Sequence, residues 1–153
     1  MFEATLCEMI KDGKILLKKA TRGVSKSKWN GLGGKLEGCE TPKENVIREV
    51  KEESNLTMKD LKNHGVITFY QGSVHKVFAI VHVFSSHDFE GEIKGTEEGD
   101  LEWFDLNSIP YDDMWADDPY WMQLLLDGKE FDAEFLFDES MEKILDHKIR
   151  IRP

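Results

Sequence analysis

The sequence predicts an α/β protein in which a sheet and two helices pack as the layers of a sandwich. Three observations support this class: a capped helix that begins near Thr41, a second helix that ends at Gly128, and strand-like runs before, between and after them. With 153 residues, 40% of them apolar, we expect one domain that spans residues 1–153.

Strand-like segments occur in both halves of the chain. Residues 3–10 and 13–19 predict two strands, joined by Asp12-Gly13, a dipeptide suited to a tight hairpin turn. Alternation along the first strand should place Thr5, Cys7 and Met9 on one face, and Ala4 and Leu6 on the other. Further strands are predicted at residues 65–70, 76–84, 101–104, 131–137 and 143–151.

Both helices carry recognisable ends. In the first, Thr41 at the N-cap, Pro42 at the first helical position and Glu44 at the third form a capping box. The apolar side of this helix is expected to comprise Val46, Ile47 and Val50. In the second, Asp118 is a good cap residue, Pro119 suits the first turn and Gly128 suits the end, with a buried stripe of Trp121, Leu124 and Leu125.

The first helix carries an unusual concentration of acid. Glu49, Glu52 and Glu53 are spaced i, i+3 and i+4, so their carboxylates share one face and repel one another. Arg48 lies four residues from both Glu44 and Glu52, where it can hold the cluster in place. A divalent cation would relieve the repulsion, and hard oxygen ligands favour Mg²⁺ or Mn²⁺. The alternative is a solvated charged face.

A glycine-rich loop precedes this helix. Gly31, Gly33 and Gly34 allow the backbone to approach a phosphate or a metal closely, and Lys35 adds a positive charge beside them. The order of residues matches neither a P-loop nor a dinucleotide-binding fingerprint. The loop and the acidic helix together suit a metal–diphosphate complex.

The spacing of these residues resembles the Nudix box. Gly34 is followed after five residues by Glu40, and after seven more by R-E-V-K-E-E, which begins at Arg48. One position departs from the pattern, because Asn55 stands where the family has glycine; asparagine also tolerates left-handed backbone. The resemblance implies a Nudix-type α/β/α sandwich with a mixed central sheet.

Two further segments, residues 29–35 and 109–126, are similar to the MutT branch of the Nudix superfamily, including the human MutT homologue and its bacterial relatives. That branch hydrolyses oxidised purine nucleoside triphosphates such as 8-oxo-dGTP to the monophosphate and pyrophosphate, which sanitises the nucleotide pool. The resemblance implies metal ligands at Glu49, Glu52, Glu53, the carbonyl of Gly33 and Glu98, with Glu97 as a competing candidate to Glu98.

The same resemblance implies substrate contacts. They are expected at Thr5, Val24, Asn30, Leu32, Gly33, Gly34, Lys35, Trp115, Asp117 and Asp118. Val24 and Ala20 stand where the human protein has an aromatic residue and a lysine, so the preferred sugar stays open. The aspartates can read the donors and the carbonyl of an oxidised purine if one is ionised and the other protonated.

The net charge of −10 argues against a surface that binds nucleic acid. No stretch is apolar and long enough to span a membrane, and the N-terminus lacks the pattern of a signal peptide, so we expect a cytoplasmic monomer. The two cysteines and five histidines show no metal-binding or triad spacing.

The proposed chemistry uses Mg²⁺ or Mn²⁺, with Arg48 and the glutamates as catalytic residues. Glu52, Glu53 and Glu98 are alternative general bases, and their spacing does not choose among them. Three rival functions remain: a Nudix hydrolase of ADP-ribose or of a dinucleoside polyphosphate, a non-catalytic nucleotide sensor, and a Nudix isomerase.

Overall fold

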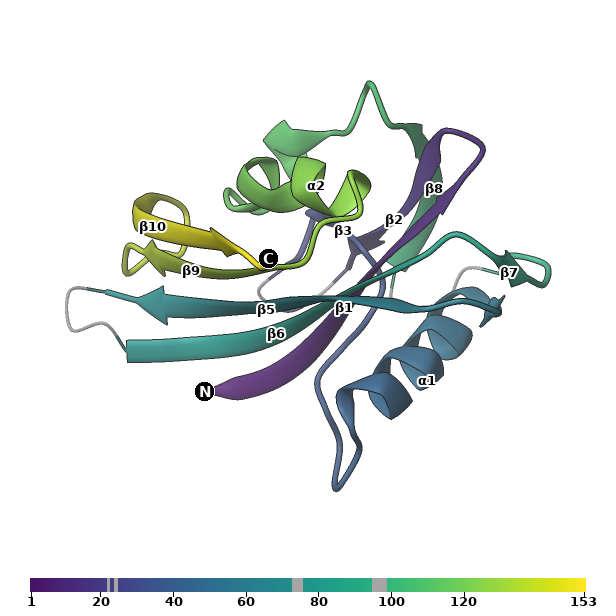
Figure 1. Ribbon diagram of the computed structural model, residues 1–153, viewed down its shortest axis with the longest axis horizontal. Coiled ribbons are helices and arrows are strands. Elements are labelled where there is room, and N and C mark those ends of the chain that lie inside the picture. Colours follow the sequence, from purple (N-terminus) through teal and green to yellow (C-terminus); the bar gives the residue numbers. More distant parts are fainter. Residues whose placement is uncertain (22, 24, 73–75, 95–98) are drawn as a thin grey trace.

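A mixed sheet lies between two helices in the computed structural model, which describes residues 1–21, 23, 25–72, 76–94 and 99–153 (Figure 1). The sheet contains β1 (Phe2–Lys11), β2 (Lys14–Ala20), β3 (Trp29–Asn30), β5 (Lys62–Gln71), β6 (Lys76–Ser86), β8 (Gly99–Asp105), β9 (Phe131–Phe137) and β10 (Ile144–Ile151). The strands follow the order β10-β9-β5-β6-β1-β2-β3, and β8 pairs with β2. Because β1 is parallel to β6 and β5 to β9, while the other pairs are antiparallel, the predicted α/β class with a mixed sheet is confirmed.

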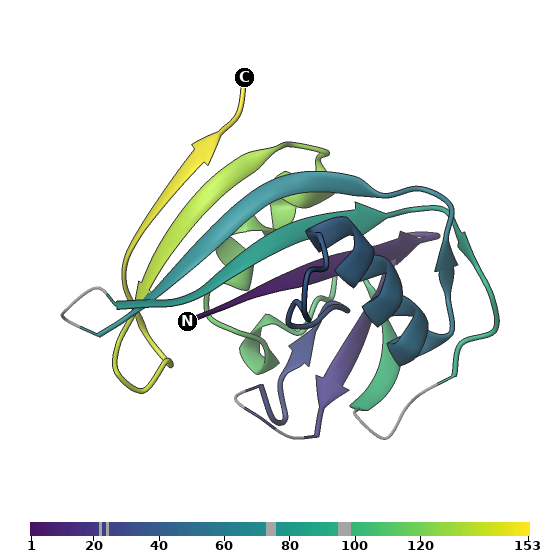
Figure 2. The same cartoon turned by 90° about the horizontal axis from the view of Figure 1, so that it is seen from below.

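The two helices cover opposite faces of the sheet, as the views in Figures 1 and 2 show for α1 (Pro42–Ser54) and α2 (Asp118–Leu126). Alternate residues of β1 serve the two layers: Cys7 and Met9 pack under α1, whereas Leu6 and Ile10 pack under α2. This confirms the predicted alternation. No helix in the described part of the chain is long and apolar enough to span a membrane.

The predicted helix ends are largely confirmed. Thr41 accepts from the backbone N–H of Glu44 at 3.1 Å, and Glu44 accepts from that of Thr41 at 3.0 Å. Asn55, with φ of 68°, ends α1 in the left-handed conformation, as the glycine that it replaces would. Ile47 is an exception on this helix, since 45% of its surface is exposed and only its neighbours Val46 and Val50 are buried.

The start of α2 differs from the prediction. The N-cap is Asp117, and neither its side chain nor that of Asp118 caps the helix by a hydrogen bond. The buried stripe also differs, because Met122 is fully buried beside Trp121 and Leu125, whereas Leu124 is only partly buried. The sequence also missed four short elements: β3, β4 (Thr57–Met58), β7 (Phe89–Glu90) and the 3-10 helix η1 (Tyr111–Asp113).

The strands β1 and β2 diverge, and the glycine loop (residues 31–35) lies between them beside β1. Both residues of their turn have positive φ, 53° at Asp12 and 75° at Gly13, as a tight hairpin requires. The two strands pair only next to this turn, and farther on the glycine loop takes the position beside β1. Its carbonyls at Leu32 and Gly34 accept the N–H groups of Cys7 and Thr5 at 2.6 and 2.9 Å. The loop is therefore held at the sheet, between the two layers.

Candidate active site

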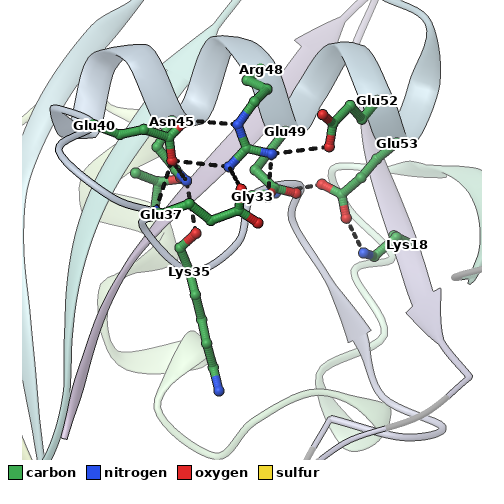
Figure 3. A network of polar contacts seen from close by, with 11 residues as sticks. Lys18, Gly33, Lys35, Glu37, Glu40, Asn45, Arg48, Glu49, Glu52 and Glu53 are labelled. Atoms are coloured by element: carbon green, nitrogen blue, oxygen red, sulfur yellow. Dashed lines mark hydrogen bonds and ion pairs between the residues drawn. The ribbon is translucent and has the colours of Figure 1, made fainter.

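Arg48 of α1 contacts several carboxylates at once (Figure 3). Its guanidinium donates to both oxygens of Glu40, Nε to Oε2 at 2.6 Å and Nη2 to Oε1 at 3.0 Å. Nη1 lies 3.0 Å from the carboxylates of Glu49 and of Glu52. The expected contact with Glu44 is not formed, because that carboxylate caps its own helix. Hydrogen bonds from Arg48 lower the pKa of Glu40 to about 2.

Asn45, which the sequence analysis overlooked, joins α1 to the glycine loop. Its fully buried amide accepts from the hydroxyl of Thr5 at 2.6 Å and donates to the carbonyl of Lys35 at 2.9 Å and to Glu40 at 3.0 Å. The ammonium of Lys35 itself points away from the acidic face and lies 4.4 Å from the ring centre of Phe2 (Figure 3). Thus loop, strand and helix are fixed to one another by a single side chain.

Glu53 is the deeply buried acid of the cluster. Its Oε1 accepts the backbone N–H of Gly33 at 2.8 Å, and its Oε2 forms an ion pair with Lys18 of β2. Burial raises the pKa of Glu53 to about 7, against the opposing effects of Lys18 and of the Gly33 N–H. The carboxylate of Glu49 lies close to the backbone of Gly34 in the same loop. A Cβ atom added to Gly34 would lie only 2.7 Å from the Glu49 carboxyl carbon. The glycine therefore makes room for a carboxylate.

The oxygen atoms of these side chains are of the type that a hard divalent cation prefers. Glu49 and Glu53 bring carboxylate oxygens to the loop, beside the backbone of Gly33, and Glu52 is held at the solvent side by Arg48. All donors are oxygens, which matches Mg²⁺ or Mn²⁺. In the described residues, no three His, Cys, Asp or Glu side chains already converge as a ligand set. Glu98 and its competitor Glu97 lie outside the described residues.

A cavity of about 240 Å³ runs from the glycine loop to the start of α2. Gly33, Gly34 and Lys18 line one end, and the other end is lined by side chains from β3 and from the segment around α2. The predicted residues on its walls are Thr5, Asn30, Gly33, Gly34, Trp115, Asp117 and Asp118. Phe69 and Phe78, which the sequence did not single out, also line the cavity, as does Trp121, which was predicted only as a buried residue of the second helix.

Asp117 and Asp118 form a buried pair of acids at the α2 end of this cavity. Asp117 Oδ2 accepts from Nε1 of Trp121 at 2.8 Å, and its Oδ1 has no hydrogen-bond partner among the described residues. Burial raises the pKa of Asp117 to about 6. Burial and the charge of Asp117 raise the pKa of Asp118 well above its usual value. The pair therefore favours the negative charge on Asp117 and the proton on Asp118.

Trp115 stands beside this pair, with its ring fixed from several sides. Its Nε1 donates to the hydroxyl of Ser25 at 2.9 Å, and the ammonium of Lys28 lies 5.3 Å from its ring centre. Asn30 reaches the cavity from β3, which is held in register by pairing with Lys18 of β2. An indole face, an amide, an acid and a carboxylate therefore meet at one end of the cavity.

Leu32 and Lys35, two of the expected substrate residues, do not line the cavity. Leu32 is fully buried in the layer under α1, and Val24 lies outside the described residues. Conversely, the sequence analysis missed Lys18 and Glu8. Glu8 carried a visible signal, since it is a lone acid in an otherwise apolar stretch of the first strand, where it is buried to 1% exposure.

A comparison with protein-family models agrees with this geometry, because the model described as NUDIX domain matches residues 4–125. The chain belongs to the Nudix family. The acidic helix, the glycine loop and the paired aspartates all fall within the matched Nudix region.

Similar Nudix proteins extend the comparison over nearly the whole chain. An "Oxidized purine nucleoside triphosphate hydrolase" from Danio rerio is 38% identical over 146 residues, which cover 95% of this chain and 92% of the relative. A protein of the same name from Mus musculus is 37% identical over 147 residues, with the same coverage of both chains. The MutT protein from Bacillus halodurans matches in structure with a TM-score of 0.86, at 24% identity and over 97% of each chain, which confirms the MutT-type fold.

Proposed function

We propose that this Nudix protein hydrolyses oxidised purine nucleoside triphosphates, such as 8-oxo-dGTP, to the monophosphate and pyrophosphate. The observation that carries the proposal is one cavity lined both by the glycine loop, whose Gly33 N–H is bound by Glu53 of the acidic helix, and by the buried acid pair. The relatives from Danio rerio and Mus musculus, whose names describe this activity, support it.

The base pocket is the end of the cavity formed by Asn30, Trp115, Asp117 and Asp118. An oxidised purine presents ring and exocyclic N–H groups beside a carbonyl oxygen. The unpartnered Oδ1 of Asp117 accepts from an N–H group, and the protonated Asp118 donates to the carbonyl. Trp115 supplies an aromatic face for stacking on the ring.

The phosphate chain is proposed to lie at the glycine-loop end. Glu49, Glu52, Glu53, the carbonyl of Gly33 and Glu98 would hold Mg²⁺ or Mn²⁺ there. When bound, such ions neutralise charge on the phosphates and lower the pKa of an attacking water. Arg48 holds two of these carboxylates, Glu49 and Glu52, next to each other by contacts of 3.0 Å with both.

The proton of the attacking water passes to a carboxylate of this cluster. Glu52, Glu53 and Glu98 are the candidates, as ligand and base are the same residue type at neighbouring positions. Monophosphate and pyrophosphate are the products when attack falls on the β-phosphorus, which is the position that the resemblance to the MutT branch implies.

A panel of nucleotides tests the proposal directly. The protein is incubated with Mg²⁺ and 8-oxo-dGTP, dGTP, ADP-ribose or a dinucleoside polyphosphate, and the products are identified by chromatography. We expect the highest kcat/KM for the oxidised triphosphate, with stoichiometric monophosphate and pyrophosphate. Preferential cleavage of ADP-ribose or of the dinucleoside compound would instead assign the rival Nudix activity, and tight binding without turnover would assign a sensor.

A further inference from the structure

Glu8 is a buried carboxyl that the proposed reaction has not used. It lies in the middle of β1, at 1% exposure, on the strand face whose other members Leu6 and Ile10 pack under α2. Its Oε2 has no hydrogen-bond partner in the described residues. Glutamate is almost never fully buried unless it is paired, and a leucine would fill the same place without desolvating a carboxyl. The acid therefore requires an explanation beyond packing.

The carboxyl of Glu8 lies directly behind the base pocket. A Cβ added to Gly31 would lie 2.6 Å from Glu8 Oε1, so the missing side chain at residue 31 is what leaves space for this carboxyl. Gly31 and Asn30 both line the cavity. The charge of Glu8 also raises the pKa of Asp118 at the start of α2 and of Tyr111 of η1, after the larger effects of burial and of nearer acids.

The groups around Glu8 leave it without a compensating charge. The titratable groups that face it are Asp118, with Asp117 beside it, from α2, Tyr111 from η1, and the adjacent Cys7 on its own strand. Burial alone raises the pKa of Glu8 to about 8. Among the three carboxyls of this region, the negative charge is therefore favoured on Asp117.

We propose that Glu8 is a third acid behind the base pocket, a positioning residue that acts through Asp118 and the Asn30–Gly31 segment to favour the oxidised base, which carries a C8 carbonyl oxygen that guanine lacks. The inference rests on the proposed function. While Glu8 is neutral, the proton of Asp118 stays available to a carbonyl of the base. An ionised Glu8 would attract that proton and place a second negative charge behind the carbonyl oxygen. Base discrimination is therefore present below pH 8 and is lost above it.

The test follows the ratio of kcat/KM for 8-oxo-dGTP to that for dGTP from pH 6.5 to 9.5, in the wild type and in Glu8→Gln. Both substrates share the metal and water chemistry, so its pH dependence cancels in the ratio. Ionisation of the base affects both proteins equally, so it cancels when the two profiles are compared. Glutamine has the shape of a neutral glutamic acid and does not titrate. Relative to Glu8→Gln, the wild-type ratio should fall roughly tenfold per pH unit above pH 8.

Glu3→Gln is the matched control, because Glu3 lies on the same strand but its carboxyl contacts His82 and is half exposed. That variant should follow the wild-type profile. Identical pH profiles of the ratio in wild type and Glu8→Gln would overturn the proposal.

A second measurement needs neither variants nor metal. The carboxyl carbon of Glu8 is titrated by ¹³C NMR in the wild-type protein, with and without 8-oxo-dGMP. If the nucleobase binds better when Glu8 is neutral, linkage requires that its binding raises the pH at the midpoint of the Glu8 titration. An unchanged midpoint in the bound protein would refute the proposed role of Glu8. A wild-type protein that hydrolyses no oxidised nucleotide would contradict the proposed function itself, whereas an active one with an unshifted Glu8 contradicts only this inference.

Discussion

Asp117→Asn should reduce discrimination between oxidised and normal guanine nucleotides more than any other single change in the base pocket. The amide oxygen can still accept from Nε1 of Trp121, which leaves the NH₂ group where the unpartnered Oδ1 of the carboxylate now lies. An acceptor for the base thus becomes a donor. Loss of a hydrogen bond to a charged group costs about 1.5–3 kcal/mol, or roughly 10- to 150-fold in kcat/KM for 8-oxo-dGTP.

Asp118→Asn is the informative comparison, because Asp118 is the neutral member of the pair and asparagine keeps a donor at that position. We expect a loss below about tenfold for this variant. The assay is steady-state kinetics for 8-oxo-dGTP and dGTP at pH 7 with saturating Mg²⁺, and the Mg²⁺ dependence should be the same in all three proteins. A larger loss in Asp118→Asn than in Asp117→Asn, or an unchanged ratio in both, would refute the assignment of the charge to Asp117.

Glu53→Gln should lower turnover by about a hundredfold or more while the circular dichroism spectrum stays native, because it removes a charged ligand without a change of shape; unimpaired turnover at limiting Mg²⁺ would contradict this. Asn45→Ala should lower the free energy of unfolding by about 1–3 kcal/mol, measured by urea denaturation, because the hydroxyl of Thr5 and the carbonyl of Lys35 lose their partner; a stability equal to the wild type would show that these bonds contribute nothing. As the pH rises from 5 to 7.5, the free energy of unfolding of the wild type should fall relative to that of Glu8→Gln by about 1.4 kcal/mol per pH unit. The reason is that the pKa of Glu8 is about 8 in the folded protein and 4.5 in the unfolded chain, so the folded protein holds an extra proton in this range. Parallel stability curves for the two proteins would exclude a raised pKa of Glu8. With a net charge of −10, the protein should not bind duplex DNA at moderate salt in a fluorescence anisotropy titration, and tight sequence-independent binding would contradict action on free nucleotides alone.

Local signals in the sequence were sufficient for most of the fold. The turn at Asp12-Gly13, the capping box at Thr41 and the left-handed end at Asn55 each depend on a few neighbouring residues, and the structure forms all of them. Alternation along the first strand correctly divided Cys7 from Leu6 between the two layers. The short elements β3, β4, β7 and η1 carry too few residues for a periodic pattern, so they were not predictable in this way.

The acidic helix face was readable from spacing, but the partners of its residues were not. Helical periodicity allowed Arg48 to reach either Glu44 or Glu52, and only the path of the preceding loop brings Glu40 into its bidentate contact. Likewise, Asn45 can join α1 to the glycine loop only because the fold brings the carbonyl of Lys35 within hydrogen-bond distance of its side chain.

The sequence by itself therefore determined the fold class, the metal-type acidic face and the presence of two adjacent aspartates. Only the tertiary structure decided which aspartate carries the charge and that Glu8 stands behind them. The physical reason is desolvation: the protonation of a carboxyl depends on the elements that bury it, and here β1, η1 and α2 come from positions about a hundred residues apart in the chain.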